Sequence, residues 1–143
     1  MIRPMRLDED TAVRAIYTAC HPTFPIRAPR WFEAHPTLVL DVRGVVGYTS
    51  YSLVMQPEVS LAGEVMIGYG IDIKPGHHGK GYGRRLCDAR LAVARAVGAK
   101  VFVGHAHPDN HAMIRLFEQD GFKPFGQAAY PDGSTMLIYM GPV

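Results

Sequence analysis

A run of nine residues at positions 78–86, His-Gly-Lys-Gly-Tyr-Gly-Arg-Arg-Leu, constrains this chain more than any other segment. It has three glycines at alternate positions, and glycine lacks a Cβ, so the backbone of this turn can approach a ligand closely. An alternating apolar segment precedes the run, and a segment with helical spacing follows it. The first N–H groups of a helix are unpaired and carry partial positive charge. The sequence therefore predicts a strand, a glycine-rich turn and a helix N-terminus that bind phosphate or pyrophosphate.

Formal positive charge is concentrated on the same segment, at Lys80, Arg84 and Arg85. The net charge of the whole chain is only +2, which by itself favours neither nucleic acid nor a membrane surface as a partner. Apolar residues make up 48% and charged residues 20%, which is typical of a folded globular protein. At 143 residues, we expect one domain covering 1–143.

The two cysteines, Cys20 and Cys87, are far apart and form no Cys-x-x-Cys pair, so neither a disulfide scaffold nor a zinc ribbon is expected. The first six residues do not resemble a signal peptide. No apolar run approaches the roughly 18 residues that a membrane-spanning helix needs. We therefore expect a cytoplasmic protein without membrane contact.

Alternation, turn residues and helical spacing predict a mixed order of elements. Gly68 and Gly70 indicate a bulge or a close backbone approach inside one of the strands. Gly98 and Gly121 are placed to end helices. The expected elements are a strand at 2–7, a helix capped within 8–11 and running to about residue 20, a loop at 21–36 with a short helix at 30–34, hairpin strands at 37–42 and 45–53, a strand at 64–73, a helix after Gly83, a strand at 101–105, a helix at 110–119, and strands at 122–128 and 135–140 around a turn at 130–133.

Two common phosphate-binding loops do not fit the glycine run. A Rossmann turn needs a third glycine where this chain has Arg84, or Leu86 in the alternative alignment. A Walker loop needs Ser or Thr after Gly-Lys, and Gly81 stands there. A small nucleotide-binding protein remains an alternative, and it predicts tighter binding of ATP or NAD than of coenzyme A.

The run resembles the acetyl-CoA loop of the GNAT superfamily of N-acetyltransferases, Gln/Arg-x-x-Gly-x-Gly/Ala, with His78-Gly79-Lys80-Gly81-Tyr82-Gly83 in its place. A second segment, residues 107–122, is similar to the family's Asn-x-x-Ala-x-x-Leu-Tyr-x-x-x-Gly-Phe. Asn110, Leu116 and Gly121-Phe122 occupy corresponding positions. The two motifs stand in the family's order and spacing, and the resemblance covers about residues 64–125.

The resemblance implies an α/β (α+β) fold with a mixed, mostly antiparallel sheet of about six or seven strands, a splayed strand pair and about four flanking helices. It implies that acetyl-CoA is the co-substrate. The pyrophosphate would lie on residues 78–84, and the pantetheine arm would pair with backbone groups near Ile71 and Ile73. Asn110 would contact the cofactor arm from the later helix, and Phe117 would lie beside it.

Phe117 occupies the position where many members carry a tyrosine that protonates the leaving thiolate, and it has no hydroxyl. His78 replaces the family's Gln or Arg, which a cradle of backbone N–H groups tolerates. The strand at 64–73 also lacks a carboxylate on the side of Ile67 and Tyr69, where members often place a glutamate. Asp72 alternates to the other face unless a bulge shifts the register.

Acetylation of an amine needs a group that takes up its proton. His105 is the preferred titratable candidate because the pKa of histidine lies near neutrality, and Tyr69 is the preferred polar side chain on the acceptor side. Each has a plainer interpretation, as a strand-end residue and as a packing aromatic. His105, His107 and His111 leave a metal site as a minor alternative, but no acidic or thiol partner stands beside them and we expect no metal.

The leading hypothesis is transfer of an acetyl group from acetyl-CoA to a primary amine by direct attack in a ternary complex. The alternative is a non-catalytic acyl-CoA-binding module, motivated by Phe117 and the missing carboxylate. Residues 8–36 and 127–135 would border the acceptor. His21, Arg27, Arg30 and His35 hint at an acidic acceptor there, although a solvated loop explains them equally. A homodimer is compatible with the sequence, which determines neither the acceptor nor the oligomeric state.

Overall fold

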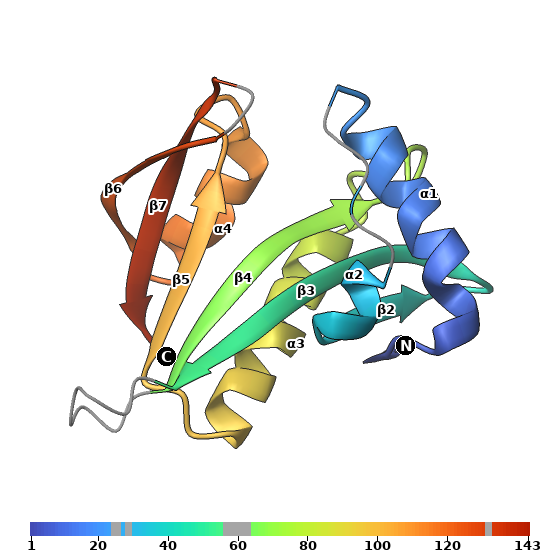
Figure 1. Cartoon of the computed structure of the whole chain (residues 1–143), viewed down its shortest axis with the longest axis horizontal. Coiled ribbons are helices and arrows are strands. Elements are labelled where there is room, and N and C mark those ends of the chain that lie inside the picture. The colour runs from blue at the N-terminus through green and yellow to red at the C-terminus, as the bar shows by residue number, and fades with distance from the viewer. Residues whose placement is uncertain (24–26, 28–29, 56–63, 131–132) are drawn as a thin grey trace. The chain divides into compact units, whose positions relative to one another are not determined.

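The computed structural model describes residues 1–23, 27, 30–55, 64–130 and 133–143. The positions 24–26, 28–29 and 131–132, within the expected loop and turn, lie outside the described residues. The elements, labelled in Figure 1, are β1 (Ile2–Pro4), η1 (Leu7–Glu9), α1 (Asp10–Cys20), α2 (Trp31–Ala34), β2 (Thr37–Asp41), β3 (Val45–Met55), β4 (Glu64–Ile73), α3 (Tyr82–Ala96), β5 (Val101–Ala106), α4 (His111–Gln119), β6 (Lys123–Ala129) and β7 (Thr135–Pro142).

Within this described part, seven strands form one sheet in the order β1-β2-β3-β4-β5-β7-β6. The β4–β5 pair is parallel, whereas the β1–β2, β2–β3, β5–β7 and β6–β7 pairs are antiparallel. The expected mixed, mostly antiparallel sheet is therefore confirmed. No helix among the described residues is long and apolar enough to cross a membrane.

The chain divides into two compact units. The first unit contains Met1–Tyr51 and Ile71–Arg90, and the second contains Ser52–Gly70 and Leu91–Val143. The glycine run therefore belongs to the first unit, and the segment around Asn110 belongs to the second.

Both faces of the sheet in the first unit are covered by helices (Figure 1). On one face, α1 and α2 pack on β2 and β3 through a buried cluster made of Val13, Ile16, Tyr17, Phe32, Val39 and Tyr48. On the other face, Leu86 of α3 packs against Leu40 and Val46, with Ile71 and Ile73 of β4 at the edge of this cluster. The face of β4 that carries Ile71 and Ile73 is thus the face covered by α3.

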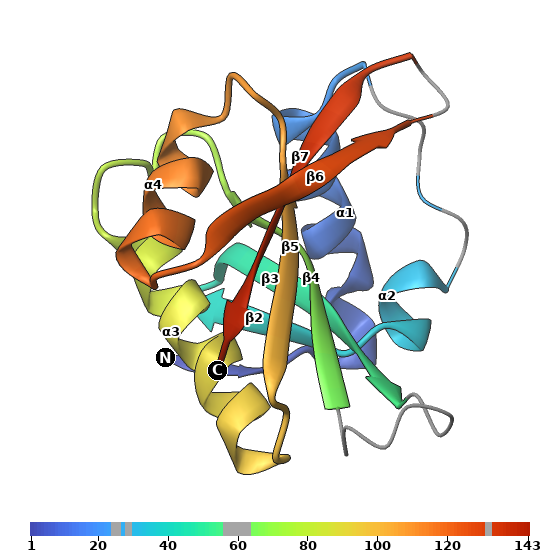
Figure 2. The ribbon, with the colours of Figure 1, turned by 90° about the vertical axis from the view of Figure 1, so that its left-hand side faces the viewer.

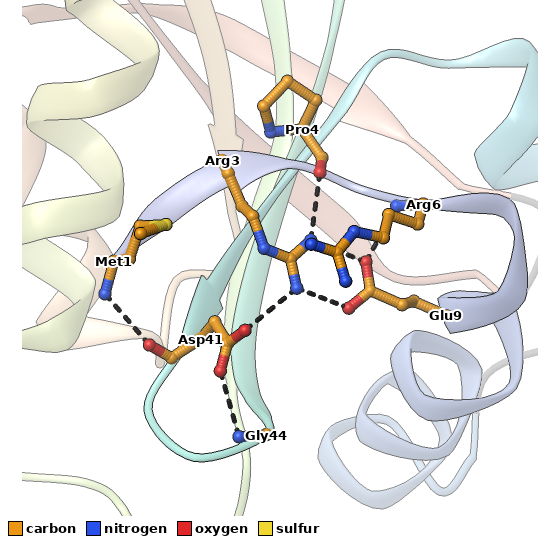
Figure 3. A network of polar contacts seen from close by, with 7 residues as sticks. All are labelled: Met1, Arg3, Pro4, Arg6, Glu9, Asp41 and Gly44. Carbon is orange, nitrogen blue, oxygen red and sulfur yellow. Dashed lines mark hydrogen bonds and ion pairs between the residues drawn. The ribbon is translucent and has the colours of Figure 1, made fainter.

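An ion-pair network joins β1, η1 and the β2–β3 hairpin (Figure 3). The Arg3 guanidinium donates to both carboxylate oxygens of Glu9, at 2.8 and 2.7 Å, and to Asp41 at 3.0 Å. Glu9 also accepts a hydrogen bond from the Arg6 backbone N–H at 2.8 Å, and Asp41 accepts one from Gly44 at 3.0 Å. The strand expected over 2–7 ends at Pro4 because Glu9 holds the following residues in a 3-10 turn.

The second unit places α4 against β5, β7 and β6 (Figure 2). Its core is aromatic: the Phe117 ring stacks on Tyr139 at 5.2 Å between centroids, and Phe102 stacks on Phe122 at 5.1 Å. The register of β4 with β5 covers Val65–Ile67 and Val101–Val103. Residues 68–70 of β4 have no register partner on β5 in the described part, which fits the expected separation of two neighbouring strands.

Candidate functional site

The glycine run has the geometry of an anion cradle. Gly79 and Gly81 have φ angles of +76° and +77°, a region that residues with a Cβ rarely adopt. A Cβ built on either glycine meets nothing within 4 Å, so the space above the turn is open. Helix α3 begins at Tyr82, directly after the turn, and its first turn closes with the Arg85 N–H donating to the Gly81 carbonyl at 3.1 Å. The arrangement fits a pyrophosphate, because the unpaired N–H groups of a helix start bind anions.

The basic side chains of this segment are only partly engaged with the protein. Arg84 is paired with Asp88 one turn along α3, at 2.7 Å, while Arg85 lies over the Tyr82 ring at 5.9 Å. Lys80 and Arg85 are exposed. The turn therefore presents positive charge to solvent at the same place as its helix start.

His78 attaches this turn to the end of β4. Its Nε2 lies 2.9 Å from the Ile73 carbonyl oxygen, and the same oxygen accepts a hydrogen bond from Cys20 Sγ at 3.3 Å. A carbonyl oxygen has two lone pairs, so these two partners occupy the Ile73 carbonyl. The predicted pairing of the pantetheine arm with backbone groups near Ile71 and Ile73 stays a prediction.

Asp72 points to the opposite face of β4 from Ile71 and Ile73, as the strand alternation predicts. It accepts a hydrogen bond from the Tyr48 hydroxyl at 2.6 Å, and its other oxygen lies 2.8 Å from His21 Nε2. The side chain of Asp72 is 12% exposed and that of His21 is 29% exposed. β4 therefore carries a carboxylate on its α1 face, on the opposite side of the strand from Ile71 and Ile73.

The Asp72 carboxylate changes the acidity of its neighbours. Burial and the negative charge of Asp72 raise the pKa of the Tyr48 phenol, so Tyr48 stays protonated and acts as a donor. Burial, and then the charge of Asp72, raise the pKa of the Cys20 thiol to about 11. Tyr48, Cys20 and Asp72 belong to β3, α1 and β4, which the fold of the first unit brings together.

Arg27 lies in a cage of aromatic rings in the same unit. Its guanidinium carbon is 3.6 Å from the centre of the Trp31 ring, 4.5 Å from that of Tyr17 and 5.3 Å from that of Phe32. Arg14 donates to the Arg27 backbone carbonyl at 2.9 Å and so holds this position. The buried Nη1 atom of Arg27 has no hydrogen-bond partner among the described residues.

The other basic residues of the first loop have structural partners. His35 stacks on Trp31 at 3.9 Å between ring centres, and its Nδ1 lies 2.7 Å from the Trp31 carbonyl oxygen. Arg30 is 82% exposed and pairs with Glu33 at 2.9 Å. Of the four basic residues noted in the sequence, His21 and Arg27 are thus the two beside the buried aromatic cluster.

The remaining predicted site residues belong to the second unit. His105 is half-buried on β5, and burial lowers its pKa, which favours the neutral imidazole. Tyr69 is partly buried on β4. Asn110 caps α4, where its side-chain oxygen accepts a hydrogen bond from the Met113 N–H at 3.1 Å, and the Phe117 ring is 1% exposed. In the described residues, no three His, Cys, Asp or Glu side chains are placed to hold a metal ion.

The structure therefore gives Asn110 and Phe117 structural tasks, as a helix cap and as a core residue. Their predicted contacts with the cofactor, like the predicted roles of Tyr69 and His105, stay predictions. Asp72 and Tyr48 were not among the expected site residues, and no local pattern in the sequence pairs two positions 24 apart. The cluster of basic residues at 21–35 was the only signal that pointed toward this part of the first unit.

Comparison with known proteins identifies the family. A family model described as the acetyltransferase (GNAT) family matches residues 7–122. The chain belongs to this family. Two solved structures confirm the fold across almost the whole chain: yncA of Salmonella typhimurium with acetyl-CoA (TM-score 0.78, 24% identity, 99% of this chain and 92% of that one) and an N-acetyltransferase from Staphylococcus aureus Mu50 (TM-score 0.80, 21% identity, 99% and 97%).

Two sequence relatives are named for their acceptors. The L-methionine sulfoximine/L-methionine sulfone acetyltransferase of Salmonella typhimurium is 34% identical over 99 residues, which are 64% of this chain. The L-amino acid N-acyltransferase MnaT of Escherichia coli is 33% identical over 99 residues, again 64% of this chain. The matches span 56% and 55% of the length of these two relatives.

Proposed function

We propose that this chain transfers the acetyl group of acetyl-CoA to the primary amine of an amino acid or a close analogue, by direct attack in a ternary complex. The observation that carries the proposal is the open turn at Gly79 and Gly81, both at positive φ, leading into α3 in a chain of the GNAT family. The acceptor class is supported by the names of the two relatives, which both specify amino acids or their analogues.

Acetyl-CoA, when bound, supplies the acetyl group as a thioester. The N–H groups of the 79–83 turn and the first turn of α3 would bind its pyrophosphate, with Lys80 and Arg85 adding positive charge. The backbone of Ile71 would orient the pantetheine arm, and an N–H group there would stabilise negative charge on the thioester oxygen. His105 remains the candidate from the sequence for the group that accepts the proton of the attacking amine. Phe117 has no hydroxyl, so the leaving thiolate would be protonated by water or another residue, or would leave as the anion.

Calorimetry with acetyl-CoA tests the turn directly. We expect Gly81→Asp to abolish binding, because the substitution places a carboxylate in the open space above the turn where the phosphates would lie. The control is Gly121→Asp, since Gly121 also has a positive φ, +79°, and nothing within 4 Å of a built Cβ. The control carries the same backbone strain outside the turn and is expected to bind like the wild type. Unchanged affinity in a folded Gly81→Asp variant would show that the ligand binds elsewhere.

Release of free thiol from acetyl-CoA, measured across a panel of amino acids and other amines, tests the reaction. A second candidate, a non-catalytic acyl-CoA-binding module, is favoured by the missing hydroxyl at Phe117. It predicts binding of acetyl-CoA without thiol release for every amine in the panel. Sustained turnover with a single amino acid rejects that candidate, and an absence of binding at millimolar acetyl-CoA rejects both.

A further inference from the structure

Asp72 and Arg27 are two oppositely charged side chains of the first unit that have no role in the acetyl transfer described above. Both lie beside the buried aromatic cluster between α1, α2 and β3. Asp72 extends from β4 toward this cluster, where it meets Tyr48 and His21. Arg27 lies on the rings of Tyr17 and Trp31. An amino acid carries the complementary pair of charges, an ammonium and a carboxylate, on adjacent atoms.

Asp72 has the properties of a group that binds an ammonium. A carboxylate has about four lone-pair sites, and Tyr48 and His21 engage one on each oxygen, so both oxygens can accept a further hydrogen bond. Asp72 also stands between Ile71 and Ile73, the two residues whose backbone is expected to pair with the pantetheine arm. An amine bound at Asp72 is therefore bound on the strand that is expected to hold the thioester.

Arg27 has the properties of a group that binds a carboxylate. Its Nη1 is buried and has no hydrogen-bond partner in the described part of the chain, although a buried charged donor without a partner is costly. Stacking on Trp31 and Tyr17 stabilises the cation through its face, whereas its N–H groups point outward in the plane of the guanidinium. The planar guanidinium matches a carboxylate in geometry as well as in charge.

Arg27 and the His21–Asp72 pair both lie beside the ring of Tyr17. The Arg27 guanidinium carbon is 4.5 Å from the centre of the Tyr17 ring, and the Tyr17 ring centre is 5.0 Å from that of His21, which lies on Asp72. Because the two distances share the Tyr17 ring, Arg27 and the His21 imidazole are separated by no more than their sum. Asp72 lies 2.8 Å from Nε2 of this imidazole, so Arg27 and Asp72 belong to the same neighbourhood of the first unit.

We propose that Arg27 and Asp72 form the acceptor subsite of this enzyme, Arg27 binding the carboxylate of an amino acid and Asp72 binding its amine. The inference rests on the proposed acetyl transfer and specifies its acceptor: a small zwitterion with an unblocked carboxylate next to the reacting amine. Simple amines and amino-acid amides then lack one of the two charged contacts.

The test compares one acceptor with and without its carboxylate charge: L-methionine sulfone and its carboxamide. We expect the wild type to prefer the acid by about 10- to 150-fold in kcat/KM, the effect of one charge-assisted hydrogen bond. Arg27→Gln removes this preference by raising KM for the acid and leaves the amide unchanged. Arg30→Gln is the matched control, because Arg30 belongs to the same loop, is 82% exposed and pairs only locally with Glu33. It is expected to keep the wild-type preference.

Asp72→Asn separates the two halves of the subsite. The amide side chain keeps partners for Tyr48 and His21 but loses the negative charge, so KM is expected to rise for both acceptors while the preference for the acid remains. If Arg27→Gln does not fold, Arg27→Lys replaces it in the test. This variant keeps the positive charge and is expected to show a smaller preference for the acid than the wild type. A wild-type preference that survives Arg27→Gln, or an unchanged KM in Asp72→Asn, overturns the proposal.

A binding measurement distinguishes this proposal from the acetyl transfer itself. Calorimetric titration of the acid and the amide into protein saturated with CoA reports on the subsite without turnover. Equal turnover of acid and amide by the wild type overturns the subsite and leaves acetyl transfer intact. If no amine releases thiol, the proposed transfer fails, and tighter binding of the acid than of the amide, lost in Arg27→Gln, still supports the subsite. Equal binding of the two overturns it.

Discussion

Gly104 and Phe117 show how closely single residues determine the packing of the second unit. A Cβ built on Gly104 of β5 lies 2.5 Å from Cζ of Phe117, closer than real Cβ contacts come. The Phe117 ring is in turn enclosed by Phe102, Phe122 and Tyr139 and is 1% exposed. The absence of a side chain at position 104 therefore creates the space that Phe117 fills.

We expect Gly104→Ala to lower the free energy of unfolding by about 1–3 kcal/mol, because the enclosed ring has no room to move away from the added methyl group. Chemical denaturation measures the change. Gly126→Ala, also in a strand, is the control, since a Cβ there meets nothing within 4 Å and the expected change is within about 0.5 kcal/mol. Equal effects of the two substitutions would contradict the packing described for Phe117.

The Cys20 thiol offers a second test at the residue scale. Its pKa is raised to about 11, first by burial and then by the Asp72 charge, so almost no reactive thiolate exists at pH 7. We expect alkylation of Cys20 by iodoacetamide to be on the order of 100-fold slower than that of free cysteine. Peptide mass spectrometry separates Cys20 from Cys87, which is 1% exposed. Asp72→Asn is expected to accelerate the reaction, and a wild-type rate equal to that of free cysteine would refute the assigned environment.

At the scale of elements, the Arg3–Glu9–Asp41 network connects the N-terminal strand β1 to η1 and to the end of β2. Hydrogen bonds from Arg3 and the Arg6 N–H lower the pKa of Glu9 from 4.5 to about 2, and bonds from Gly44 and Arg3 lower that of Asp41. Both carboxylates are thus stabilised in their charged form by folding. One arginine connects strand β1, the turn η1 and the β2–β3 hairpin.

The sign of the resulting pH dependence follows from these shifts. A carboxyl group with a lowered folded-state pKa contributes stability that is fully present above its unfolded pKa and is lost as the pH falls through the folded value. We therefore expect the free energy of unfolding to decrease between about pH 5 and pH 2. Arg3→Gln should flatten this decrease, whereas Arg115→Gln, on the exposed side of α4, should leave it unchanged. Urea unfolding at several pH values measures the free energy of unfolding as a function of pH. The same pH dependence in wild type and Arg3→Gln would disprove that Arg3 lowers the pKa values of Glu9 and Asp41.

At the scale of the whole molecule, a ligand that binds only the folded chain raises its melting temperature. At 100 times its dissociation constant, acetyl-CoA adds about 2.7 kcal/mol, which corresponds to roughly 5–10 °C for a chain of this length. Differential scanning calorimetry is expected to show this increase for wild type and Gly121→Asp and none for Gly81→Asp. An equal increase in all three proteins would place the binding site away from the turn.

Most elements are predictable from the sequence because their signals are local. The strand at 64–73 was predicted with the bounds it has in the structure, and the hairpin strands differ from prediction only at their ends. Gly98 and Gly121 follow the last turns of α3 and α4 with φ angles of +80° and +79°, as expected of residues that end helices. The helix expected to be capped within residues 8–11 and to end near Cys20 is α1, which spans Asp10–Cys20 with Glu9 at its N-cap position.

By itself, the sequence determined the glycine turn, the helix that follows it and the resemblance to one family, because each depends on residues within a few positions of one another. Only the tertiary structure decided which side chains from distant parts of the sequence meet in the first unit. Asp72 meets His21 across 51 residues and Tyr48 across 24, and the Arg27 guanidinium stacks on rings from α1 and α2. Such contacts follow from the packing of α1 and α2 on the sheet, which no local periodicity specifies. The cofactor turn is thus a property of local sequence, and the proposed acceptor subsite is a property of the fold.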